Sequence, residues 1–145
     1  MMAFLKRRLA GNEIQACLHA ILFLGLLLFV NPAAAADIQV IDGGALVVDG
    51  RTVRLWGIET PTAAQTCVTT AGRSWPCGKR ARDELRSVVQ ENVVVCQPKA
   101  PGFELCRVAG LDVGALLVKE GLARARGDYQ ELEARARSAH VGLWE

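Results

Sequence analysis

Signals of several common functions are missing from this 145-residue sequence. It has no C-x-x-C motif, and its two histidines are poor metal-site candidates, since His19 lies in the apolar N-terminal stretch and His140 stands alone. A redox-active cysteine pair and a cysteine- or histidine-based metal site are therefore not favoured. Internal repeats, low-complexity tracts and linkers are also absent, and the length suits one domain after an N-terminal leader.

Basic residues are not in excess outside the N-terminus. The formal charge of +2 comes from residues 1–36, which hold three Lys or Arg and one Glu, so the rest of the chain has 14 residues of each sign. Nucleic-acid-binding domains usually carry a basic excess or stripe that attracts phosphate. Nucleic acid is thus a possible partner, but the charge does not favour it.

Residues 1–36 have the features of a secretory signal peptide. The basic segment Lys6-Arg7-Arg8 precedes an apolar run over residues 20–30, and the alanines at 33–36 offer an A-x-A cleavage site before Asp37. The apolar run is shorter than the roughly 20 residues that span a bilayer. We predict a secreted or periplasmic protein with a mature domain of residues 37–145 and without stable membrane insertion; an uncleaved membrane anchor is the alternative.

Four cysteines remain in the predicted mature domain, an even number that indicates two disulfides in an exported protein. Three pairings of four cysteines are possible. We predict Cys67–Cys77 and Cys96–Cys106, because each pair is local. The second pair also lies symmetrically about residues 101–102, where a hairpin would turn.

The strongest local pattern is a β-hairpin over residues 45–56. Residues 45–48 (ALVV) are rich in β-formers, Asp49-Gly50 suits a two-residue turn, and residues 52–56 (TVRLW) form the return strand. On that strand Arg54 and Trp56 share one face, because side chains alternate along a strand.

Three helices are predicted after the hairpin. Residues 79–90 have helical spacing of apolar positions, Asp112 is a plausible N-cap of a second helix, and Asp128 a plausible cap of a third over residues 129–139. Between the first two helices, residues 93–96 and 103–109 read as strands.

Residues 40–46 (VIDGGAL) and 54–62 (RLWGIETPT) resemble the motifs V-x-D-G-D-T-L and R-L-x-G-I-D-x-P-E of the staphylococcal nuclease-like (thermonuclease) family. The resemblance continues through residues 121–123 (GLA) and 142–144 (GLW), so it covers essentially the whole mature chain. It implies an α+β domain, a five-stranded OB-fold barrel of the partly open Greek-key type, with three helices.

The same resemblance implies hydrolysis of phosphodiester bonds in DNA and RNA with one Ca²⁺. In the family, two aspartates and a backbone carbonyl hold the metal, a glutamate acts near the attacking water, and two arginines hold the phosphate. A hard cation prefers several anionic oxygens, and guanidinium groups stabilise the charge that develops on phosphorus oxygens.

Part of this set is retained. The first arginine is Arg54, the second metal aspartate is replaced by Glu59, and the carbonyl donor is Thr60. Asp42 corresponds to an aspartate in the outer environment of the metal, so it is only a weak candidate ligand. Arg54 has two open roles, contact with an anionic ligand or a structural ion pair with Glu59 or Asp42.

The remaining positions are changed. Gly44 stands where the first metal aspartate is expected, Thr62 where the glutamate is expected, and Phe103 where the second arginine is expected. Arg107 lies four residues further along the same strand, about 13 Å away, too far to replace that arginine. Glu104 would bring a negative charge to the approach of a phosphate.

These substitutions predict a catalytically degenerate, exported domain that binds an unknown ligand or protein on the barrel face, as a monomer and without a cofactor. The alternative is an active secreted nuclease that cleaves DNA or RNA with Ca²⁺ held by the remaining carboxylates. A third possibility is a structural or assembly role in the cell envelope.

Overall fold

The computed structural model describes residues 37–90 and 92–145. The predicted signal peptide lies outside the described residues. Within the described part, no helix is both long enough and apolar enough to cross a bilayer.

Five main strands form a mixed sheet in the order β1-β2-β3-β8-β7. Neighbouring strands are antiparallel except for β3 and β8, which run parallel. This is an α+β fold, and the predicted OB-type arrangement of five strands with three helices is confirmed. The strands are β1 (Ile38–Asp42), β2 (Ala45–Val48), β3 (Arg51–Leu55), β7 (Val94–Ala100) and β8 (Phe103–Val108).

Five further strands of two residues each complete the connections. β9 (Leu111–Asp112) pairs with β8, while β4 (Ile58–Glu59) pairs with β10 (Arg124–Ala125). β5 (Cys67–Val68) and β6 (Ser74–Trp75) form a small hairpin of their own within the connection before the first helix.

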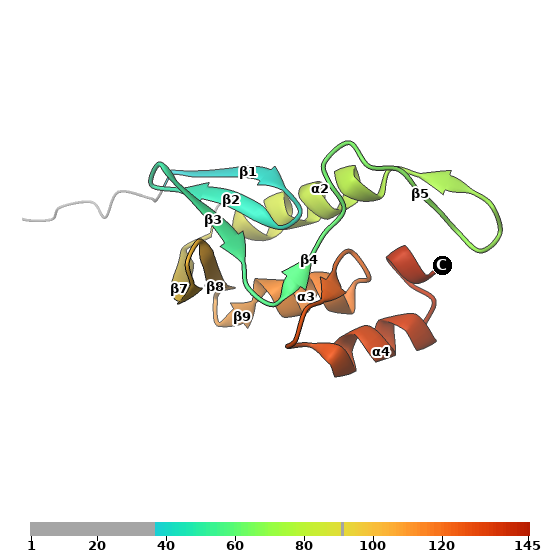
Figure 1. The fold of residues 1–145 in the computed structure, drawn as a ribbon. Coiled ribbons are helices and arrows are strands. Elements are labelled where there is room, and N and C mark those ends of the chain that lie inside the picture. The colour runs from blue at the N-terminus through green and yellow to red at the C-terminus, as the bar shows by residue number, and fades with distance from the viewer. Residues whose placement is uncertain (1–36, 91) are drawn as a thin grey trace, which may run out of the picture. The chain divides into compact units, whose positions relative to one another are not determined.

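Helix α2 (Cys77–Val89) packs along β1, as Figure 1 shows. Helix α3 (Val113–Lys119) packs against β8 and against α4 (Gln130–Ser138), and a short 3-10 helix, η2 (Gly142–Trp144), follows. Helices α2 and α3 bury apolar faces against the sheet, and α4 packs on α3. Such packing is the main source of helix stability in a small domain. The core includes Leu46, Val53, Leu55, Leu85, Cys106, Val113 and Leu117, each at most 2 % exposed.

The predicted turn between β2 and β3 and the predicted cap of α3 are found in the structure, whereas the predicted cap of α4 is not. Asp49 and Gly50 both have positive φ between β2 and β3, so the predicted hairpin is confirmed. Asp112 caps α3 as predicted, since its Oδ1 accepts the backbone N–H of Ala115 at 3.1 Å. The prediction for Asp128 is wrong: Tyr129 occupies the N-cap position of α4, and the Asp128 carboxylate instead accepts the indole N–H of Trp56 at 2.7 Å.

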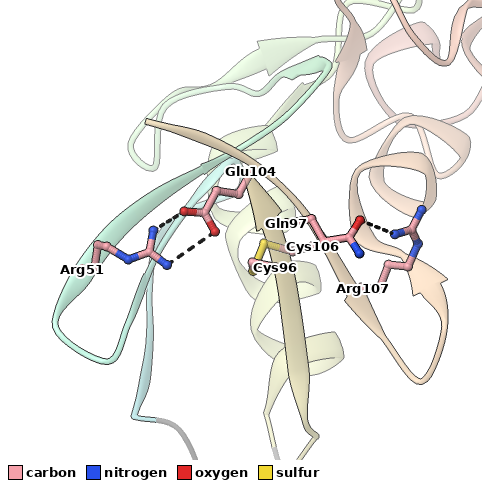
Figure 2. The surroundings of a disulfide bond; sticks show 6 residues. All are labelled: Arg51, Cys96, Gln97, Glu104, Cys106 and Arg107. Atoms are coloured by element: carbon pink, nitrogen blue, oxygen red, sulfur yellow. Dashed lines mark hydrogen bonds and ion pairs between the residues drawn. A yellow bond between two sulfur atoms is a disulfide. The ribbon is translucent and has the colours of Figure 1, made fainter. Parts of the chain in front are cut away.

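Both predicted cysteine pairs lie at disulfide distance. Cys67 and Cys77 join the β5–β6 hairpin to the start of α2, with their Cα atoms 5.6 Å apart. Cys96 and Cys106 are direct cross-strand partners in the β7–β8 hairpin, with Cα atoms 4.0 Å apart. β7 extends to Ala100, whereas the predicted strand ended at residue 96. Only residues 101–102 therefore remain for the turn to β8, where Gly102 has a φ of 77°. Figure 2 shows the second disulfide between two polar pairs: Arg51 of β3 with Glu104 of β8, and Gln97 of β7 with Arg107 of β8.

Candidate functional site

The β1–β2 turn and the end of β4 meet at Gly44. The Asp42 carboxylate accepts the backbone N–H of Gly44 at 2.8 Å, and the Gly44 carbonyl accepts the backbone N–H of Leu55 at 2.8 Å. A Cβ atom on residue 44 would lie 2.7 Å from Thr60 Oγ1. The space in which a side chain at position 44 would begin is thus occupied by the Thr60 hydroxyl, and one oxygen of Asp42 is used to hold the turn.

Glu59, the retained candidate metal carboxylate, forms an ion pair with Arg126. The two residues lie diagonally across the β4–β10 pair, whose register sets Arg124 opposite Glu59 and Ala125 opposite Ile58. The Arg126 backbone N–H donates to the Gly57 carbonyl at 2.7 Å. This hydrogen bond fixes the backbone of the residue that carries the guanidinium. The carboxylate that a metal would need therefore already has a cationic partner.

Arg54 lies on the outer face of β3, exposed between the buried Val53 and Leu55. Its Cα partner on β8 is Phe103, and paired residues of a ladder share one face of the sheet. Arg107 is four residues along β8 from Phe103 and so points to the same face, where it donates to Gln97 Oε1 at 3.3 Å.

Together with Trp56, two residues after Arg54, these side chains define the outer patch, which holds two cationic and two aromatic groups: Arg54, Trp56, Phe103 and Arg107. Among residues 37–90 and 92–145, no carboxylate forms an ion pair with Arg54. The alternative in which Arg54 pairs with Glu59 or Asp42 is not the arrangement found.

Glu104 does not face an approaching phosphate, contrary to the prediction from its position in the sequence. Its side chain is 8 % exposed and pairs with Arg51 at the start of β3. Figure 2 shows this pair on one side of the Cys96–Cys106 disulfide and Arg107 on the other. The hydrogen bond to Glu104 raises the pKa of the Arg51 guanidinium, and the negative charge of Glu104 is balanced away from the outer patch.

Thr62 contacts Gln65 and Gly78. Its backbone N–H donates to Gln65 Oε1 at 3.3 Å, and its carbonyl packs so closely on Gly78 that a Cβ at that glycine would overlap it. The side chain of Thr62 is exposed and has no group that could deprotonate a water.

Two aromatic hydrogen bonds fasten the segment before α4 to the sheet and to α3. Besides the Trp56–Asp128 bond, the Tyr129 hydroxyl donates to Asp112 Oδ2 at 2.9 Å. Burial, followed by this hydrogen bond, raises the pKa of the Tyr129 hydroxyl. A Cβ on Gly57 would lie 2.9 Å from the Tyr129 ring, so the glycine permits the ring to approach β4. Tyr129 thus has a positioning role in the fold.

At the two positions where the family has metal-binding aspartates, this chain holds a single carboxylate, Glu59. Ca²⁺ takes six to eight oxygen ligands and its affinity depends on the number of charged ones. In the part of the chain that the structure describes, no group of three or more His, Cys, Asp or Glu side chains is arranged to hold a metal ion. The two nearest carboxylates, Glu59 and Asp42, are bound to Arg126 and to the Gly44 N–H.

The family model described as staphylococcal nuclease homologue matches residues 52–145 of the sequence. The chain belongs to this family. A search of curated proteins returned no match. The resemblance stated from the hairpin motifs is therefore confirmed, and the domain has the fold of a nuclease family that binds nucleic acid.

The roles assigned to individual site residues of this nuclease-family domain stay predictions. The structure brings Gly44 together with Thr60, and Arg54 together with Phe103, while the contacts given for Thr62 are with Gln65 and Gly78. Sequence reasoning missed Arg126 as the partner of Glu59. The only signal was the alternation of residues 124–126 (RAR), which suits a short strand but does not say which strand it joins.

Proposed function

We propose that this nuclease-family domain is exported and works by binding, without hydrolysing phosphodiester bonds. The observation that carries the proposal is the state of the two metal-carboxylate positions: one is Gly44, with Thr60 filling the space of its side chain, and the other, Glu59, is paired with Arg126. Thr62 and Phe103 add the loss of a general base and of a phosphate clamp. Removal of a single strong electrostatic donor typically lowers a rate by about 10²–10³.

The outer patch is the binding surface that the geometry favours. Arg54 offers guanidinium donors to an anionic group, and Phe103 beside it offers a ring against which a planar group stacks. OB barrels use faces of this kind for ligands of several classes. We expect a ligand with at least one anionic group, contacted by Arg54.

A metal-dependent nuclease is the second candidate, because Arg54 and Glu59 are both retained at positions that the family uses. The two candidates are separated by incubating the oxidised protein with single-stranded DNA and RNA in Ca²⁺, Mg²⁺, Mn²⁺ or chelator. We expect no cleavage in any of these conditions. Metal-dependent cleavage that both Arg54→Ala and Glu59→Ala abolish would refute the proposal and establish an unusual nuclease.

Binding is measured in the same preparations by fluorescence anisotropy of labelled single-stranded oligonucleotides. If the ligand is nucleic acid, Arg54→Ala weakens binding and Arg73→Ala, an exposed arginine of the β5–β6 hairpin, does not. If the wild-type protein does not bind the oligonucleotides, the anionic ligand is of another class. Binding of an anionic polysaccharide to the wild type and to Arg54→Ala is then measured. Binding that is equal in wild type and Arg54→Ala would exclude the outer patch as the contact surface.

A further inference from the structure

Glu59 and Arg126 are held as diagonal neighbours by backbone hydrogen bonds, not only by their charges. β4 and β10 pair through residues 58–59 and 124–125, and the ladder is extended by the Arg126 N–H, which donates to Gly57. Diagonal neighbours across an antiparallel pair are within reach of long side chains. The guanidinium thus lies beside the Glu59 carboxylate as a consequence of strand pairing.

This arrangement matters for cations because Glu59 is the one metal-carboxylate position of the family that is still acidic. A divalent ion that bound there would have to displace the guanidinium and would remain close to its positive charge. Both effects oppose metal binding, since like charges repel and the existing ion pair is lost. The neighbouring position, Gly44, supplies no second carboxylate to compensate.

We propose that Arg126 takes the place of the metal ion at Glu59, so that this domain excludes divalent cations from the site and contacts its ligand without them. The inference rests on the proposed function, because it explains how a binding face persists after the metal is lost. The Arg126 side chain is 64 % exposed and has more N–H donors than the contact with Glu59 uses. The donors that Glu59 does not use suit an oxyanion, such as a phosphate or a carboxylate group.

The test measures cation binding directly and needs no ligand. Tb³⁺, a hard oxygen-seeking probe, is titrated into the oxidised protein with tryptophan-sensitised luminescence as the readout, and Ca²⁺ is used as competitor. We expect Arg126→Gln to raise the affinity for Tb³⁺ about tenfold over wild type, because repulsion and the competing ion pair are removed together. Glu59→Gln added to Arg126→Gln should abolish the gain.

Arg124→Gln is the matched control. It removes the same charge two residues before Arg126, within β10. Arg124 is the backbone partner of Glu59, but its guanidinium lies over the Trp144 ring at 5.1 Å. An equal gain in Arg124→Gln and Arg126→Gln would show a general effect of net charge and would overturn the proposal. Tight Glu59-dependent binding in the wild type would overturn it as well.

A second set of variants asks whether Arg126 still blocks the site when a carboxylate is restored. Gly44→Asp alone should bind Ca²⁺ weakly, and Gly44→Asp with Arg126→Gln about tenfold more tightly. Gly44→Ala is the folding control, because any side chain at position 44 must displace the Thr60 hydroxyl. Equal Ca²⁺ affinities of the two Gly44→Asp proteins would contradict the role of Arg126. Failure of the outer patch to bind a ligand would leave these cation results unchanged, so the two proposals fail separately.

Discussion

Glu133 is the acidic residue whose replacement should have the clearest effect on stability. It lies in α4 with its side chain 10 % exposed, accepts the backbone N–H of Ala125 at 2.5 Å, and accepts from Arg137 Nε at 3.0 Å. Because Ala125 is in β10, this carboxylate anchors the strand that places Arg126, the next residue, diagonally across from Glu59.

The magnitude follows from the groups that would lose a partner. Residue Ala125 is 8 % exposed, and Glu133→Ala leaves its backbone N–H without an acceptor. The expected cost in the free energy of unfolding is roughly 1–3 kcal/mol. Glu133→Gln keeps an acceptor oxygen but loses the negative charge, so its expected cost is about 1 kcal/mol.

The pH dependence has a definite sign. Burial alone would raise the pKa of Glu133, but the Ala125 N–H and the Arg137 guanidinium outweigh it, and the net result is a pKa below the ordinary 4.5. A carboxyl whose pKa is lowered by folding stabilises the protein above its unfolded-state pKa, and this contribution is lost as the pH falls through the folded-state pKa. The difference between wild type and Glu133→Gln should therefore be full at neutral pH and should shrink as the pH falls below 4.5.

Urea unfolding of the oxidised protein, followed by tryptophan fluorescence at about pH 7 and about pH 3, measures both effects. Glu131→Gln is the control on the same helix, since its side chain is 91 % exposed and its contact with Arg135 is 3.8 Å long. We expect it to change stability by less than about 0.5 kcal/mol. Equal losses in the two variants, or a Glu133→Gln deficit that does not change with pH, would refute the reasoning.

Two further predictions concern covalent and local stabilisation. Replacing Cys96 and Cys106 together by serine should lower the free energy of unfolding by about 2–3 kcal/mol, the entropic value for a loop of this length. Under reducing conditions, the difference in stability between this variant and equally reduced wild type should shrink. A difference of unchanged size would indicate that the packing of the cysteines, and not the disulfide, is responsible. Asp112→Ala should cost about 1–2 kcal/mol because it removes the α3 cap and the acceptor of Tyr129. Tyr129→Phe, which keeps the cap, should cost less in the same urea titration, and an equal cost would show that the cap contributes nothing.

Elements defined by neighbouring residues were predictable. The turn at Asp49-Gly50 depends on two residues that tolerate positive φ, and the alternation of Val53 and Leu55 with Arg54 shows which face of β3 is buried. The Cys96–Cys106 pair could be inferred because its hairpin is short and its two cysteines lie at nearly the same distance from the turn. The one-residue difference is taken up by the register shift between Pro98 and Ala100. The cap of α4 was mistaken, because Asp128 is used by Trp56, a residue 72 positions away in the sequence.

The partners of charged residues were not predictable in the same way. Glu104 has the same charge whether it faces a ligand or Arg51, and the parallel pairing of β3 with β8 decides between these. The pairing of Glu59 with Arg126 similarly requires β4 and β10 to meet across a separation of 67 residues. Neither strand is long enough to carry a pattern that identifies its partner.

The sequence by itself determined which chemical groups this domain possesses: an arginine at position 54, a glutamate at position 59, and no carboxylate at positions 44 and 62 or guanidinium at position 103. These are properties of single residues, and a motif comparison reveals them without coordinates. Only the tertiary structure decided what each remaining charge contacts, because an ion pair depends on the distance between side chains of strands that are remote in sequence. That is why the replacement of the family's motif residues could be read from the sequence, whereas the guanidinium of Arg126 beside Glu59 could not.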